Sequence, residues 1–134
     1  MRDIKFRGFE PISKKFIYGN LLFTNETYYI IPFLTNGCMS QKEMMLRWIS
    51  PCYQVISETV GQYTGLKDKN SVEIYEGDIV KNTYGKLEKV VFVNGSFQCA
   101  SINHPSLNLY LLDTYSNHIE VVGNIHEWSE DNDK

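Results

Sequence analysis

Residues 87–97 read Leu87-Glu-Lys-Val-Val-Phe-Val-Asn-Gly-Ser-Phe97, and this stretch decides the fold class. An apolar run ends at Asn94-Gly95, and Ser96–Ile102 follows as a second candidate strand. Asn-Gly is the preferred pair at the centre of a type I′ turn, because both central positions need a positive φ. The stretch therefore predicts an antiparallel β-hairpin.

Short strands separated by turn residues continue in both directions from this hairpin. Apolar residues either alternate with polar ones or form short runs bounded by Gly, Pro, Asn and Asp. Pro32 should place its strand at an edge or a bulge, because proline cannot donate a ladder hydrogen bond. The further strands predicted are Arg2–Phe9, Phe16–Tyr18, Leu21–Thr24, Tyr28–Leu34, Ile74–Tyr75, Ile79–Asn82, Leu107–Leu112 and Ile119–His126. Val60–Leu66 is a strand or a bend, and tight turns are predicted at Gly19-Asn20 and Gly85-Lys86.

One segment has a helical pattern. Ser40-Gln-Lys-Glu43 has the form of a capping box, and Met44, Met45, Trp48 and Ile49 follow at helical spacing. We predict a short helix over about residues 41–49, although strand residues could produce the same pattern.

Short strands without alternating helices favour a barrel or a sandwich over a parallel sheet. The run Gly77-Asp-Ile-Val80, followed by Gly85 and the hairpin, is typical of the opening of small SH3-like barrels. We predict a mainly β fold in which an N-terminal β-meander (residues 1–66, at most one short helix) packs on an SH3-like β-barrel (residues 67–128). The turn Lys67–Ser71 would join them, the two regions could act as one compact domain, and residues 129–134 would form a flexible acidic tail.

Composition narrows the class of protein. The chain has 134 residues, 43% of them hydrophobic and 22% charged, with a net charge of −3, which excludes fibrous and wholly disordered classes. Its charged opening predicts no signal peptide, and the longest uncharged stretch, Thr27–Gln41, contains Pro32 and Gly37, so we expect no membrane span. Cys38, Cys52 and Cys99 are odd in number and form no C-x-x-C pair, which favours a reducing cytoplasm.

A resemblance covers residues 1 to about 127. Ser57–Asn70 followed by Glu73–Val80 resembles the signature of the YopX family of phage and prophage proteins. Further matching stretches are Met1-Arg-Asp-Ile-Lys-Phe-Arg7, Tyr18-Gly-Asn-Leu21, Asn94-Gly-Ser-Phe97 and Glu120-Val-Val-Gly-Asn-Ile125. The resemblance implies a β-rich fold, a phage-derived gene and an intracellular setting. It implies no established activity, because the family is of uncharacterised function.

The departures from the family pattern are local. Ser57 stands where members usually have Pro, Ser71 stands where they have Gly, and Gly8-Phe9-Glu10 stands where they have Ala-Trp-Asp. Without that Gly, Asn70 or Ser71 must take any left-handed position in the turn, which Asn adopts more readily. We expect the turn itself to survive.

Catalytic and metal sites are weakly indicated. Glu73, Glu76 and Asp78 could serve a hydrolase as an acid pair, but the last two also suit a turn before a strand. His118, Glu120, Asn124 and His126 would share one face of the last strand. A straight strand separates the two histidines by roughly 26 Å, whereas zinc ligands lie within about 4 Å of each other. His104 and the three cysteines belong to no ligand or nucleophile motif. We predict no catalytic residue, metal or cofactor.

Aromatic residues interleaved with lysines are a weak sign of nucleic-acid binding. The candidate surface comprises Tyr63, Lys67, Lys69, Lys81, Lys86 and Phe97, with Tyr75, Tyr84 and Lys89 nearby. Glu73, Glu76, Asp78 and Glu88 would cancel much of its positive field, and the net charge is negative. The same aromatic residues would suit an ordinary β core.

We therefore favour a non-enzymatic protein-binding or self-association module over a nucleic-acid-binding protein or a hydrolase. Tyr28–Leu34 carries no charge and would be a sticky strand in a monomer, so we expect a homo-oligomer. The expected contact residues are Tyr28, Tyr29, Ile30 and Ile31, or Met44 and Trp48 in the segment Met44–Trp48. The partner would be a second copy or another protein, with no membrane involved.

Overall fold

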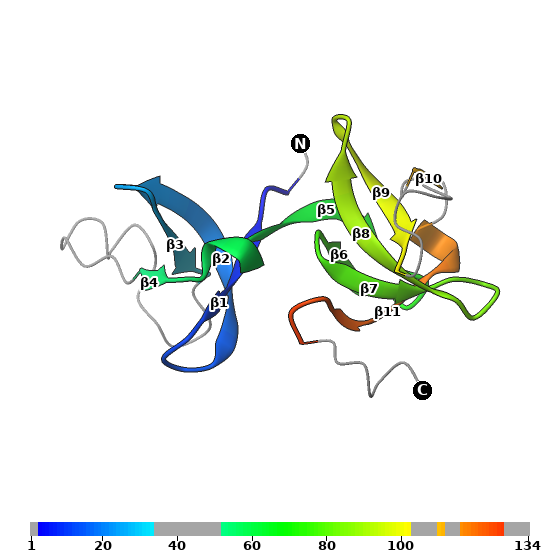
Figure 1. The fold of residues 1–134 in the computed structure, drawn as a ribbon, viewed down its shortest axis with the longest axis horizontal. Coiled ribbons are helices and arrows are strands. Elements are labelled where there is room, and N and C mark those ends of the chain that lie inside the picture. Colours follow the sequence, from blue (N-terminus) through cyan, green and yellow to red (C-terminus); the bar gives the residue numbers. More distant parts are fainter. Residues whose placement is uncertain (1–2, 34–51, 103–109, 112–115, 128–134) are drawn as a thin grey trace. The chain divides into compact units, whose positions relative to one another are not determined.

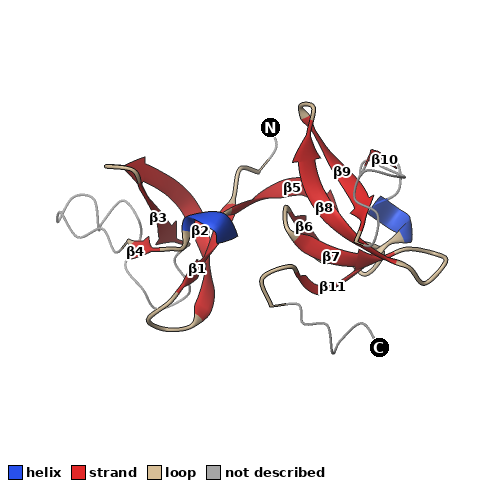
Figure 2. Ribbon diagram, viewed as in Figure 1, coloured by secondary structure: helices blue, strands red, loops and turns tan. Residues whose placement is uncertain are grey.

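The structure of the chain, a computed structural model, describes residues 3–33, 52–102, 110–111 and 116–127. The chain divides into an N-terminal unit, Ile4–Gln62, and a C-terminal unit formed by the residues from Tyr63 onward together with those before Ile4 (Figure 1). Strands make up most of the described residues, and the only helical turns among them are 3₁₀ turns (Figure 2). The mainly β fold is confirmed, while the predicted helix at 41–49 and the tail at 129–134 lie outside the described residues.

The N-terminal unit is an antiparallel sheet with the strand order β4-β3-β2-β1. Its strands are β1 (Phe6–Glu10), β2 (Lys15–Thr24), β3 (Thr27–Pro32) and the two-residue β4 (Tyr53–Gln54). The first two residues of β5 (Gly61–Lys67) pair with β1. The first three strands follow one another as a meander, as the sequence predicted.

Gly19 lies inside β2, so the turn predicted at Gly19-Asn20 is wrong. Gly19 pairs with Pro32, and a Cβ on Gly19 would lie 1.9 Å from the carbonyl oxygen of Ile31. The glycine therefore permits a close backbone approach instead of a change of direction. The chain turns later, at Asn25 and Glu26, which take positive φ values of 50° and 61°.

A segment after β4 ties β3 to β1. The Val55 N–H donates to the Tyr28 carbonyl and the Ile56 N–H donates to the Phe9 carbonyl. The 3₁₀ turn η1 (Ser57–Thr59) follows, and Thr59 Oγ1 accepts the Phe9 N–H at 2.8 Å. Val55 is buried over Gly8, where a Cβ would lie 2.7 Å from its Cγ2. Residues 55–59 thus link β3 to β1 and pack against the sheet at Gly8.

The C-terminal unit holds a second antiparallel sheet with the strand order β10-β9-β8-β7-β11. Its strands are β7 (Asp78–Lys81), β8 (Leu87–Val93), β9 (Ser96–Ser101), β10 (Tyr110–Leu111) and β11 (Glu120–Asn124), while β6 (Glu73–Tyr75) pairs with β5. The buried cluster of this unit comprises Ile74, Val80, Val90, Cys99 and Ile119. Val80 of β7 and Val90 of β8 belong to it. Burial alternates at the start of β8, whereas Asp78, Ile79 and Val80 of β7 are all buried.

The hairpin at Asn94-Gly95 is confirmed. Both residues have positive φ values, 52° and 80°, and Val93 pairs with Ser96 across the turn. The predicted SH3-like barrel is not confirmed, because the ladder of the described strands ends at β10 on one side and at β11 on the other. Closure of a barrel needs pairing between strands far apart in sequence, and local turn motifs do not specify it.

Asp68 anchors the turn that follows β5. The side chain is buried, and its Oδ1 accepts the N–H groups of Asn70 at 2.7 Å and Val72 at 2.9 Å. Its Oδ2 accepts the Val121 N–H at 2.8 Å, 53 residues further along the chain. One carboxylate therefore shapes the turn and also fastens the last strand to it.

Ser71 takes the left-handed position in this turn, with a φ of 65°. Since a side chain is strained there and glycine is not, Ser71→Gly is expected to raise the free energy of unfolding by about 0.5–1 kcal/mol. Urea denaturation of the purified chain measures the change. The matched control is Ser101→Gly in β9, where glycine should destabilise the strand. A loss of stability in Ser71→Gly would contradict the strain assigned to this position.

Candidate functional site

A groove of about 580 Å³ crosses the N-terminal unit. It is lined by residues 10–12 from the turn between β1 and β2, residues 26–28 at the start of β3, and residues 52–58 along and after β4. The sheet brings these three segments together because residues 55 and 56 bond to β3 and β1 respectively. Its volume is in the range of sites that hold a small ligand or several side chains of a partner.

Exposed apolar side chains surround the groove. Ile12 is 90% exposed at the tip of its turn, and Tyr53 and Ile56 are also exposed. The buried Val55 lies between the last two in sequence. Exposed apolar side chains gathered around a hollow are characteristic of interaction surfaces.

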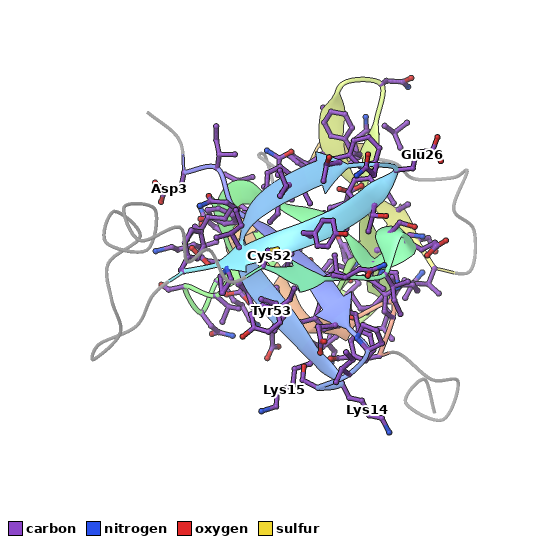
Figure 3. All side chains as sticks on the ribbon, turned by 90° about the vertical axis from the view of Figure 1, so that its left-hand side faces the viewer. Asp3, Lys14, Lys15, Glu26, Cys52 and Tyr53 are labelled. Atoms are coloured by element: carbon purple, nitrogen blue, oxygen red, sulfur yellow. The ribbon has the colours of Figure 1, made fainter. Side chains whose placement is uncertain are left out.

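The strand β4 adds an edge to this surface. It pairs with β3 through Gln54 and Tyr29 and through Tyr53 and Ile30. Within the described residues, no strand pairs with its other side. Figure 3 shows Cys52 and Tyr53 at the centre of this face of the unit.

Glu10 holds the turn that carries Ile12. Its carboxylate is buried and accepts both the Ser13 N–H and the Ser13 hydroxyl. The Lys14 N–H donates to the Glu10 carbonyl at 2.9 Å, and Lys14 has a positive φ of 58°. Three hydrogen bonds within residues 10–14 therefore hold the turn.

The hydrogen bond from the Ser13 hydroxyl, followed by that from the Ser13 N–H, lowers the pKa of Glu10 below its ordinary value of 4.5. A group with a lowered pKa stabilises the folded state above its unfolded pKa, and the stabilisation disappears as the pH falls through the folded pKa. Glu10→Gln should therefore lose stability relative to the wild type at neutral pH, and this difference should shrink as the pH falls below about 4.5. Urea midpoints measured between about pH 7 and about pH 3 test this expectation.

Ser13→Ala provides the control, because it removes the largest cause of the lowered pKa. In that background, Glu10→Gln should show a smaller dependence on pH. A difference between Glu10→Gln and wild type that stays constant over the whole range would contradict the assignment.

Acidic and basic side chains lie on different parts of this face. Glu26 and Glu58 are exposed and line the groove, while Lys14 and Lys15 are exposed on the turn beside it. Figure 3 shows the two lysines projecting from the end of their turn, away from Cys52 and Tyr53. In the part of the chain that the structure describes, none of these four side chains forms an ion pair. The groove is acidic and the neighbouring turn is basic.

The residues of the candidate nucleic-acid surface are not gathered into one patch of exposed rings. Tyr63 is only 6% exposed and packs against Tyr75, with ring centroids 5.5 Å apart. Phe97 packs against the buried cluster of the C-terminal unit. Lys67, Lys81 and Lys86 are exposed, and Lys69 lies 3.9 Å from Glu120. A buried ring has no face available for a base.

The three candidate acids lie around the turn between β6 and β7. Asp78 is buried, and its Oδ2 accepts the Tyr75 N–H at 2.7 Å. This bond is the turn chemistry that the sequence offered as the alternative to catalysis. None of the three acids lines the groove.

No group of three or more His, Cys, Asp and Glu side chains among the described residues could hold a metal ion. His118 ends the 3₁₀ turn η2 (Ser116–His118), and the Asn124 Oδ1 accepts the His126 N–H at 3.0 Å. A register shift between Val121 and Gly123 interrupts the strand between them. Cys99 is buried and Cys52 is exposed, whereas Cys38 and His104 lie outside the described residues.

The expected oligomer contacts lie mostly on β3. Ile30 is fully buried, while Tyr28, Tyr29 and Ile31 are half-buried. The Tyr28 ring packs against Phe23, with centroids 4.6 Å apart, and Tyr28 also lines the groove. Leu34, Met44 and Trp48 lie outside the described residues.

The sequence interpretation missed Ile12, Glu26 and Glu58 as site residues. The available signal was an isoleucine placed in a turn between Pro11 and two lysines, a position where an apolar side chain has no strand face to enter. The groove itself had no local signal, because its three segments are far apart in the chain.

Comparisons with known proteins give one family match and a similar solved structure. The family model described as YopX protein matches residues 5–130. The crystal structure of protein EF1440 from Enterococcus faecalis is 26% identical, with a TM-score of 0.58, and the match covers 95% of this chain and 96% of that one. No curated protein matches the chain. None of the described helices is long and apolar enough to cross a membrane.

Proposed function

Since this chain belongs to the YopX family, we propose that it is a phage- or prophage-encoded accessory protein that binds protein and catalyses no reaction. Its first partner in this proposal is a second copy of the same chain. The phage origin rests on the family resemblance, and a cytoplasmic location rests on the odd number of cysteines and the lack of a C-x-x-C motif.

The observation that carries the proposal is the groove of the N-terminal unit. It combines a hollow of about 580 Å³ with the 90% exposed side chain of Ile12 and an edge strand that pairs on one side among the described residues. Apolar anchors beside a hollow provide most of the binding energy at protein interfaces. An edge strand offers backbone groups to an incoming chain.

The alternatives have less support. Nucleic-acid binding would use Tyr63, which is buried, on a chain with a net charge of −3. Hydrolysis would use Glu73, Glu76 and Asp78, but the carboxylate of Asp78 already accepts the Tyr75 N–H in the turn between β6 and β7. The groove of the N-terminal unit is lined by none of the residues named for either alternative.

Sedimentation equilibrium of the full chain over a wide concentration range tests the proposal. We expect the average mass to rise from 15.6 kDa toward twice that value as the concentration increases. A mass of 15.6 kDa at every concentration would contradict self-association. Salt-dependent binding of single-stranded DNA by such a monomer would favour the nucleic-acid alternative instead.

A further inference from the structure

We propose that two copies of the chain dock face to face, with the turn at residues 11–15 of each copy seated in the groove of the other. We name this turn the basic turn. The inference rests on the proposed function and specifies which surface self-association uses.

The shape of the surface supports a two-fold arrangement. A two-fold dimer brings the same patch of both copies together, so the patch must contain both a projection and a hollow. The basic turn projects with Ile12 at its tip, and the groove lies directly beside it because residues 10–12 line one end. The patch formed by the basic turn and the groove therefore contains both the projection and the hollow that a two-fold contact needs.

Charge supports the same pairing. Lys14 and Lys15 extend from the basic turn, and the exposed carboxylates of Glu26 and Glu58 line the groove. Each of these four side chains lacks an ion pair among the described residues. Placing the turn of one copy in the groove of the other pairs opposite charges at both symmetry-related contacts.

The rigidity of the basic turn lowers the cost of docking. The Glu10 carboxylate receives two hydrogen bonds from Ser13, and the Glu10 carbonyl receives one from Lys14. A loop that is already ordered loses little conformational entropy when it binds. The chain itself supplies an apolar tip and a basic flank beside every groove.

Charge reversal with rescue tests the inference. One variant is Lys14→Glu/Lys15→Glu, which turns the basic turn acidic, and the other is Glu26→Lys/Glu58→Lys, which turns the groove basic. Each variant alone meets two repulsive contacts in its own dimer, so we expect each homodimer to dissociate at least about tenfold more readily than the wild type. In an equimolar mixture, both contacts of the heterodimer pair opposite charges again, and dimers should return.

The control is Lys81→Glu/Lys86→Glu, which reverses two exposed lysines of the C-terminal unit and should leave the dimer unchanged. Far-ultraviolet circular dichroism and urea midpoints establish that every variant is folded. Sedimentation equilibrium then measures each variant and the mixture at the same ionic strength, because salt weakens charge pairing.

Two results would overturn the inference while self-association stands. Either both reversed variants dimerise as the wild type does, or the mixture fails to restore dimers that each variant has lost. A wild-type chain that is monomeric throughout contradicts the self-association on which the inference rests, as well as the inference itself. A monomer that binds a synthetic basic peptide in the groove would assign the groove to another protein and also overturn the inference.

Discussion

Replacing Gly19 with alanine is expected to cost the chain about 3 kcal/mol or more of its free energy of unfolding, the largest loss expected from a single methyl group here. The added Cβ would lie 1.9 Å from the carbonyl oxygen of Ile31 and 2.8 Å from the Cα of Pro32. Both are backbone atoms, so the clash is relieved only if β2 and β3 move apart. The hydrogen bond from the Phe33 N–H to the Tyr18 carbonyl lies beside this contact and should weaken.

Gly65→Ala is the matched control for this experiment. Gly65 has a positive φ of 86°, and nothing lies within 4 Å of a Cβ built on it. Its replacement should therefore cost only the backbone strain of about 1 kcal/mol. Urea denaturation gives both values, and amide hydrogen exchange of Tyr18 and Leu21 shows whether the loss is located at β2. Equal costs for the two variants would contradict the close approach.

Asp68→Asn is expected to lower the free energy of unfolding by about 2–4 kcal/mol, although it changes only one atom and one charge. Asp68 accepts N–H groups on both oxygens, two from the turn on Oδ1 and one from Val121 on Oδ2. An amide has one oxygen, so its NH₂ group must face an N–H donor on one side. The bond to Val121 is expected to break, because the two bonds within the turn are local.

Asp3→Asn is the matched control, because Asp3 is exposed and the substitution removes the same charge. It should change the free energy of unfolding by no more than about 0.5 kcal/mol. Amide exchange at Val121 should accelerate in Asp68→Asn and not in Asp3→Asn. Unchanged protection at Val121 would show that the carboxylate does not fasten β11 to the turn.

Features set by neighbouring residues were predictable from the sequence. The hairpin at Asn94-Gly95 depends on the φ preferences of two residues, and the apolar run Val90–Val93 leads directly into it. Gly19 was misread because the same residue serves turns and close approaches, and only the position of Ile31 distinguishes the two. The turn after β5 formed as expected, with Ser71 and not Asn70 in the left-handed conformation.

Features that depend on distant contacts were not predictable. Barrel closure was expected from local motifs, yet the described ladder ends at β10 and β11. The groove joins residues 10–12, 26–28 and 52–58, and no pattern within any one of these segments indicates the other two. The buried position of Tyr63 likewise follows from its packing against Tyr75 across two strands, not from its neighbours in sequence.

The strand β5 gives the chain a fixed order of completion during synthesis on the ribosome. Gly61 and Gln62 complete the ladder of the N-terminal unit by pairing with β1, whereas Tyr63 pairs with Tyr75 in the C-terminal unit. Domains emerge from the ribosome N-terminus first and fold as units. In a nascent chain that ends before Gly61, β5 is missing, so β1 pairs only with β2 among the described strands. In a chain that ends before Tyr75, the second half of β5 has not yet gained its partner β6. When synthesis has passed Gln62, the N-terminal unit has all its described strand pairings, whereas the C-terminal unit still lacks most of its strands.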